Sequence, residues 1–227
     1  MGVALPRWVW IGAGLLACVA GMVNVVGYLG FEHQAITHLT GTTTLLGEAV
    51  AKRDLRAISH LAGVALAFMA GAALSGMLIQ DSTLKLGRRY GVALVLESLL
   101  LFAAIPLFRH GQLAGALLAA MACGLQNAMA TTYSGAVIRT SHLSGMFTDL
   151  GIGIGHALRG LPLQKRRLML CGLIIAGFFT GAVLGALLFM HFGYRALAVP
   201  AAITGSIGLG YAVYRHAQVR RGGAESA

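Results

Sequence analysis

Long apolar runs alternate with short polar links along the whole chain. An α-helix needs about 20 mostly apolar residues to cross the hydrocarbon core of a bilayer. Six runs reach this length, and they cover residues 8–31, 57–79, 90–108, 111–137, 168–192 and 196–214. The pattern predicts an all-α polytopic membrane protein with six transmembrane helices.

Two further segments, residues 35–51 and 141–158, have a different pattern. They are rich in Thr, Ser, Gly and His but still contain Leu, Val and Ile. They are too polar to face lipid, and backbone of this kind enters a membrane only where protein surrounds it. We therefore expect two re-entrant or broken helices beside the six spans. If both segments crossed fully, the chain would have eight spans.

The two halves of the chain resemble one another. Gly21-Met-Val-Asn24 matches Gly124-Leu-Gln-Asn127 at an offset of 103, residues 38–47 match 142–151 at 104, and residues 68–74 match 178–184 at 110. Three matches in the same order predict two homologous repeats, residues 1–109 and 110–227, each with three spans and one polar segment. An odd number of spans inverts the second repeat, which is typical of secondary transporters and some channels. Eight spans would make the repeats parallel instead.

Composition agrees with the membrane reading. Apolar residues make up 57% of the chain and charged residues 11%, with 32 glycines, whereas soluble domains carry about 25% charged residues. This excludes an ordinary soluble domain and a disordered chain. The net charge of +10 would suggest nucleic acid in a soluble protein. Here the basic residues lie in the links between spans, so we interpret them as a topology signal and expect no nucleic-acid partner.

The basic residues also predict the orientation. With six spans, 12 Lys and Arg lie on the side of the two termini and 5 on the other side. Because cytoplasmic links carry the excess of Lys and Arg, both termini are expected in the cytoplasm. Eight spans would return the same division, so the count does not decide between the two topologies.

Three motifs resemble those of a known family. Gly21-x-x-Asn24, His38-Leu-Thr-Gly41 and Gly124-Leu-Gln-Asn127-Ala are similar to the YoaK-like family of small bacterial integral membrane proteins. The resemblance extends from Gly21 to the last span. It implies a location in the bacterial inner membrane and a polytopic fold. The family is described by its hydropathy and not by an activity, so function has to be argued from the residues.

Two asparagines and the two polar segments supply candidate solute ligands. Asn24 and Asn127 occupy matching places in spans one and four, where a buried amide joins helices or contacts a solute. Gln126 is a weaker candidate because the first half has no match for it. Glycine lets backbone approach a ligand, and the free N–H groups at a helix start favour an anionic or hydrogen-bonding solute. Alternatively, the hydroxyls only cap these helices or bond to their own carbonyls. The candidates in the polar segments are His38, Thr40, Gly41, Thr44, His142, Ser144, Gly145 and Thr148.

Two acids are candidates for proton or cation coupling. Glu97 lies in an apolar run with no other charge nearby in sequence, and an ionised carboxylate there would cost roughly 2.5 kcal/mol or more. Its carboxyl group is therefore neutral, paired, or beside water. The alternative to proton coupling is that a neutral Glu97 only fixes a contact between helices. Asp149 lies in the second polar segment, where its match in the first is Leu45. Glu48 precedes Lys52 by four residues, the spacing of a surface ion pair.

These features together predict a transporter or permease for a small polar or anionic solute, with proton coupling by Glu97 or Asp149. The site would lie at the midplane between the repeats. The alternatives are a passive channel, a structural membrane protein or an intramembrane enzyme. No catalytic or metal-binding motif occurs, so we expect no enzyme activity, cofactor or metal. The expected partners are the lipid bilayer, a small solute and protons, and a homodimer is compatible with the small-residue helix faces.

Overall fold

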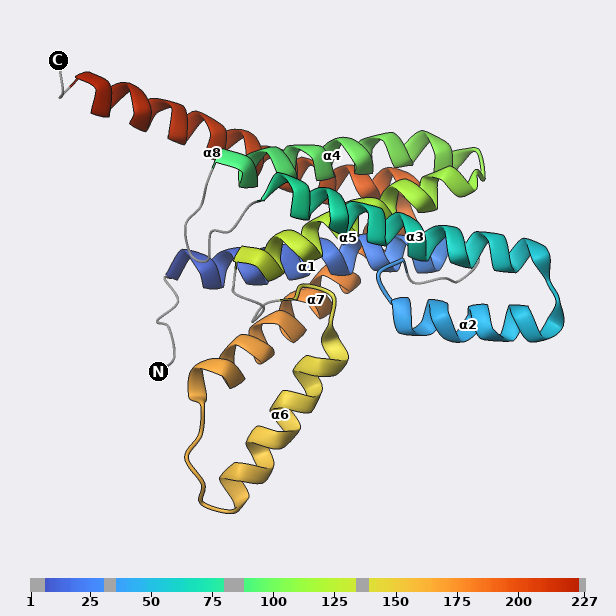
Figure 1. Ribbon diagram of the computed structural model, residues 1–227, viewed down its shortest axis with the longest axis horizontal. Helices are drawn as coiled ribbons and strands as arrows, with labels where there is room; N and C mark the ends of the chain where they lie inside the picture. The colour runs from blue at the N-terminus through green and yellow to red at the C-terminus, as the bar shows by residue number, and fades with distance from the viewer. Residues whose placement is uncertain (1–6, 31–35, 80–87, 134–138, 225–227) are drawn as a thin grey trace.

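The computed structural model describes residues 7–30, 36–79, 88–133 and 139–224, and over these residues it is built from helices alone (Figure 1). The predicted all-helical class is therefore confirmed for this part of the chain. The elements are α1 (Arg7–Gly30), α2 (Leu39–Lys52), α3 (Leu55–Leu78), α4 (Arg88–Arg109), α5 (Leu113–Tyr133), α6 (Leu143–Leu158), α7 (Lys165–Phe192), the 3-10 turn η1 (Gly193–Leu197) and α8 (Ala198–Ala224).

The helices follow the hydropathy pattern closely. Six of them start within a few residues of the predicted spans, and α2 and α6 coincide with the two polar segments. The main difference is α8, which continues to Ala224 instead of ending at Tyr214. The hydropathy pattern predicts only the apolar part of this helix. The residues that follow Tyr214 include Arg, Ala and Gln, which favour a helix in water as well. The predicted limits at 31, 35 and 137 lie outside the described residues.

Five segments of the described chain are long and apolar enough to cross a membrane: Val9–Gly30, Leu55–Leu78, Arg89–Arg109, Leu113–Thr132 and Lys165–Tyr214. The last has 50 residues and contains α7, η1 and the first part of α8. The two polar helices differ from these segments in length. With 14 and 16 residues, α2 and α6 extend about 21 and 24 Å, whereas the hydrocarbon core is about 30 Å thick.

Each polar helix packs along the spanning helix that follows it, α2 along α3 and α6 along α7 (Figure 1). The link from α2 to α3 shows why. Arg53 takes a left-handed conformation at φ 56° and closes α2 with its N–H on the carbonyls of Ala49 and Val50. The carboxylate of Asp54 then accepts a hydrogen bond from the Ala57 N–H at 3.0 Å and starts α3. The two helices therefore form a tight helical hairpin.

Two close helix crossings, α1 with α7 and α3 with α5, depend on glycine. On α7, a Cβ at Gly181 would lie 1.9 Å from the Cys18 carbonyl oxygen of α1. On α3, a Cβ at Gly71 would lie 1.9 Å from the Met121 carbonyl oxygen of α5. Such distances leave no room for any side chain, so the backbones touch. Close packing of this kind holds helices together in lipid, where burial of apolar surface gives no net drive.

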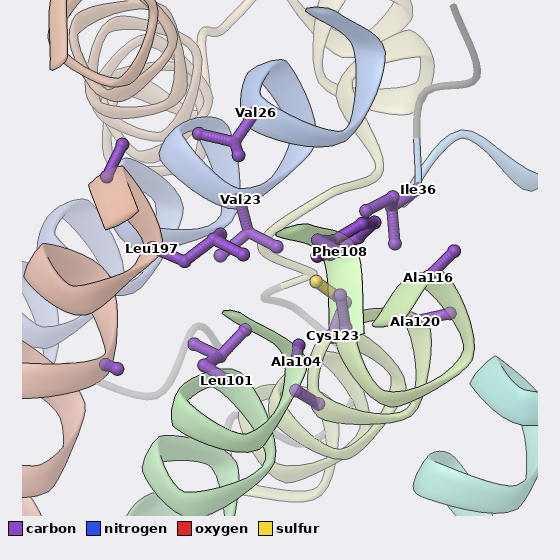
Figure 2. Packing of buried hydrophobic residues seen from close by; sticks show 14 of the residues in the cluster. Val23, Val26, Ile36, Leu101, Ala104, Phe108, Ala116, Ala120, Cys123 and Leu197 are labelled. Atoms are coloured by element: carbon purple, nitrogen blue, oxygen red, sulfur yellow. The ribbon is translucent and has the colours of Figure 1, made fainter. Parts of the chain in front are cut away.

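The interior contains two apolar clusters, and Figure 2 shows one of them, where side chains from α1, α4, α5 and η1 meet. Small residues such as Ala116 and Ala120 on α5 let α4 approach it closely. At the edge of this cluster the Tyr194 ring stacks on Phe108, with centroids 4.9 Å apart, and its hydroxyl donates to the Gly30 carbonyl. The cluster thereby joins η1 to the end of α1.

Candidate functional site

Asn24 holds the segment that leads into α2. Its Oδ1 accepts two hydrogen bonds from Thr37, one from the backbone N–H at 3.0 Å and one from the hydroxyl at 2.8 Å. Thr37 is buried and lies two residues before the first residue of α2. The amide thus fixes the start of this polar helix against α1. This agrees with the structural role that the sequence left open for Asn24, and it does not test solute contact.

The equivalent contact in the second half is made by Gln126 and not by Asn127. Gln126 accepts a hydrogen bond from the Thr140 hydroxyl at 3.0 Å, three residues before α6 begins. Its amide nitrogen donates to Glu97 Oε1 at 2.9 Å. Glu97, Gln126 and Thr140 therefore form a continuous chain from α4 through α5 to the start of α6, which we call the polar chain.

The polar chain is almost completely buried. The exposed fractions of Glu97, Gln126 and Thr140 are 2%, 1% and 1%. Glu97 Oε2 has no hydrogen-bond partner among the described residues, and neither has Asn127 Oδ1. A buried acceptor without a donor costs about 1–3 kcal/mol. Glu97 therefore has one neutral donor and no cationic partner in the described part of the chain.

The two histidines occupy the same position in the two halves. His38 and His142 each directly precede the first residue of a polar helix and form no side-chain cap. The His38 ring lies over Gly41, where a Cβ would be 2.5 Å from its Cδ2. The His142 ring lies in the same way over Gly145, at 2.6 Å from the built Cβ position. The glycines thus make room for the imidazole rings, which gives them a structural reason beside the expected approach of a ligand.

The hydroxyl candidates bond largely to their own helices. Thr44 donates to the Thr40 carbonyl at 3.0 Å, and Thr148 donates to the Ser144 carbonyl at 2.9 Å. This is the local bonding that the sequence left open as an alternative to solute contact. All four side chains lie at exposed positions on α2 and α6. Hydroxyl oxygens bonded in this way can still accept a hydrogen bond.

Asp149 is paired. It makes a bidentate ion pair with Arg167 of α7, with distances of 2.9 Å from Nη2 to Oδ1 and 3.2 Å from Nε to Oδ2. Cys171 lies nearby, its Sγ 4.0 Å from Oδ2. An acid engaged in this way is less available to a cation or proton than Glu97.

Glu48 forms the predicted surface pair with Lys52 on α2, and its carboxylate raises the pKa of Lys52. This confirms the i,i+4 reading of the two residues. In the described part of the chain, no group of three His, Cys, Asp or Glu side chains lies close enough to hold a metal ion.

One hydrogen bond joins candidate residues of the two halves, from Gln126 of the second repeat to Glu97 of the first. Among the described residues, no hydrogen bond or ion pair joins the candidates in the first polar segment to those in the second. Sequence reasoning missed Thr37 and Thr140 and ranked Gln126 too low. The polar residue directly ahead of His38 was the signal for Thr37, whereas the same signal ahead of His142 points to Ser141, one residue after Thr140. Gln126 had no such signal, because its partners come from two other segments.

A family model described as "Protein of unknown function (DUF1275)" matches residues 12–210. The chain belongs to this family. The matched region extends from α1 into α8, includes both polar helices and the polar chain, and agrees with the resemblance to YoaK-like membrane proteins. No curated protein and no solved structure matches the chain. The apolar helices of this DUF1275 member indicate a membrane protein.

Proposed function

We propose that this DUF1275 protein is a transporter or permease that moves a small polar or anionic solute across the bacterial inner membrane. One observation carries the proposal. Asn24 lies six residues before the end of α1 and Gln126 seven residues before the end of α5, which corresponds to about 9 and 11 Å along the helix axes. These amides hold the segments leading into α2 and α6, so both short helices begin part-way along the spanning helices and not level with their ends.

Short helices that begin inside a bundle are well suited to binding a solute. Their first N–H groups have no partner within the helix, and the positive end of the helix dipole favours a negative or hydrogen-bonding group. Discontinuous helices in transporters use their ends in this way. The proposed ligands are the residues at and near these starts. They are Asn24, His38, Thr40, Gly41, Thr44, Asn127, His142, Ser144, Gly145 and Thr148.

The proposed architecture is two inverted repeats of three spans with one re-entrant helix each. The glycine contacts support it. A Cβ at Gly21 would lie 2.1 Å from the Phe178 carbonyl oxygen, and a Cβ at Gly124 would lie 2.0 Å from that of Phe68. The offset of 103 matches Gly21 with Gly124 and the offset of 110 matches Phe68 with Phe178, so the two contacts correspond. The same offsets also match the Gly181–Cys18 contact with Gly71–Met121, so both crossings agree with the repeat.

The length of the last apolar segment supports the proposed count of six spans. The segment Lys165–Tyr214 has 50 residues, and as one helix it would extend about 75 Å, more than twice the thickness of the hydrocarbon core. The chain turns instead at Gly193, which has a positive φ of 57°, so α7 and α8 count as separate spans. In Figure 1, α1 begins and α8 ends toward the same end of the long axis. This agrees with both termini in the cytoplasm.

Glu97 is the favoured coupling group. It is buried, lies at the middle of α4 and has one oxygen without a hydrogen-bond partner among the described residues, whereas Asp149 is neutralised by Arg167. A carboxyl that is neutral when buried and ionised when hydrated can carry a proton with the solute. A passive channel with the same architecture would lack this dependence on a pH gradient.

The test is flux in proteoliposomes with an enclosed pH dye, across a panel of anionic, zwitterionic and neutral polar solutes. Wild type is expected to move one solute class with an accompanying proton signal. Glu97→Gln is expected to lose the proton signal, and His142→Ala to lose solute flux. His156→Ala, an exposed histidine near the other end of α6, serves as the matched control and should retain both. If wild type moves no solute across the panel, the transporter proposal is wrong.

A further inference from the structure

The two halves hold their polar helices differently. In the first half, Asn24 accepts both donors of Thr37, the residue before His38. The matching residues in the second half are Asn127 and Ser141, but Asn127 Oδ1 is buried without a partner in the described structure. The start of α6 is instead held one residue earlier, through Thr140 and the polar chain.

The polar chain has no equivalent in the first half. The offset of 110 that relates α3 to α7 also relates α4 to α8. It matches Ser98 with Gly208 and Gly91 with Ala201, so the Ser98–Ala201 hydrogen bond corresponds to the close contact of Gly91 and Gly208. The members of the polar chain and the Asp149–Arg167 pair all fall on apolar residues of the other half. The matching pairs are Gln126 with Val23, Thr140 with Ile36, Glu97 with Ile207, Asp149 with Leu45, and Arg167 with Ala57.

This difference affects how each short helix is held. Val23 and Ile36 belong to the buried apolar cluster, where Figure 2 labels both, and an apolar contact is insensitive to charge. Their counterparts Gln126 and Thr140 connect α6 to an ionisable group. Among the described residues, only the second polar helix is joined to a carboxyl group by a chain of hydrogen bonds.

We propose that Glu97, acting through the positioning residues Gln126 and Thr140, makes the attachment of α6 depend on a proton, while α2 stays fixed. This deepens the proposed function and rests on it, since α6 would be the moving element of transport. When Glu97 is ionised, the Gln126 amide donates to a carboxylate, and such a bond is about twice as strong as one between neutral groups. The amide then keeps its oxygen toward Thr140, and the start of α6 is held.

Proton uptake reverses this effect. A proton from the aqueous phase binds a Glu97 carboxylate oxygen, and no other covalent bond changes. The bond from Gln126 becomes a neutral, weaker one, so the amide is held less firmly, and the carboxylic O–H can bond the Gln126 oxygen beside Thr140 or in its place. The hold on Thr140 weakens, and Ser141 can approach the Asn127 oxygen, as Thr37 does with Asn24 in the first half.

Few other titratable groups face Glu97 in the described structure. On α5 the nearest is the buried Cys123 thiol. On α8, Tyr211 contacts Gly91, nearly two turns before Glu97. Tyr194 and Arg195 of η1 lie at the far end of α4, where Tyr194 stacks on Phe108. His142 lies at the start of α6 itself, as His38 does at the start of α2, and the Asp149–Arg167 pair lies farther along α6. The comparison of wild type with Glu97→Gln therefore isolates the contribution of Glu97.

Hydrogen–deuterium exchange of the full chain in lipid nanodiscs tests this without any substrate. The readout is the exchange rate of the second turn of α6 divided by that of the second turn of α2, at a series of pH values, because the N–H groups of the second turn are bonded within the helix. The α2 turn is the internal control, because the ratio cancels the chemical pH dependence of exchange. In wild type the ratio should rise about 5-fold from alkaline to acidic pH, the loss expected for one hydrogen bond of about 1 kcal/mol.

The variants separate a proton-dependent attachment from a merely structural one. Glu97→Gln should give a ratio that does not vary with pH. Thr140→Val should give a high ratio at every pH, and the conservative Thr140→Ser should restore the wild-type profile. A flat ratio in wild type, or a pH-dependent one in Glu97→Gln, overturns the proposal whether or not any solute moves. A pH-dependent ratio in a protein without flux upholds it and rejects the transporter function alone.

Discussion

Gly71 and Gly181 allow the sharpest quantitative prediction, because each has a control on its own helix. A Cβ at either position would lie 1.9 Å from a backbone carbonyl oxygen of the facing helix. Ordinary contact begins at 3.4 Å, so Gly71→Ala must separate α3 from α5 by about 1.5 Å. A gap of 0.5–1 Å already loses a quarter to a half of the dispersion energy between two surfaces.

The expected cost is therefore large for a single methyl group. Overpacking of a well-packed interface costs about 1–3 kcal/mol, and the long crossings of α3 with α5 and α1 with α7 favour the upper end. Gly76 on α3 and Gly172 on α7 have no atom within 4 Å of a built Cβ. Alanine there should leave the packing intact and stabilise the helix by up to about 1 kcal/mol.

The measurement is thermal unfolding of the four alanine variants in detergent, followed by fluorescence and by size-exclusion chromatography. Gly71→Ala and Gly181→Ala should melt at clearly lower temperatures than wild type and by similar amounts, since their contacts correspond in the two halves. Gly76→Ala and Gly172→Ala should melt at or above the wild-type temperature. If Gly71→Ala were as stable as Gly76→Ala, the reasoning on backbone contact would be refuted.

Two further variants test the attachments of the polar helices. Asn24→Ala leaves both donors of Thr37 without their acceptor, so unfolding stability should fall by about 1–3 kcal/mol; a double variant with Thr37→Val should cost less than the sum of the single ones, and strict additivity would argue against the bond. Asp149→Asn removes the pair with Arg167, whose side chain is 56% exposed, so stability should fall by less than about 1 kcal/mol and less again in high salt. A larger, salt-independent loss would contradict this reading.

The sequence alone determined the helices. A run of apolar residues predicts a spanning helix from its own length and composition, and for this reason the described limits of α1, α3, α4 and α7 lie close to those expected. The polar segments were recognisable for the same local reason. The charge distribution and the matched motifs likewise depend only on residue order, and they led to the family to which the chain belongs.

Only the tertiary structure decided which polar residues act together. Gln126 is joined to Glu97, 29 residues away, and to Thr140, 14 residues away. The three residues lie on three different segments of the chain, so no spacing within one helix brings them together. Asp149 likewise finds Arg167 across the link between α6 and α7. Hydrogen bonds are short and directional, so a change of one residue in register transfers them to different partners. The matched asparagines suggested equal halves, whereas packing gave the Asn24 oxygen two donors and gave the Asn127 oxygen none among the described residues.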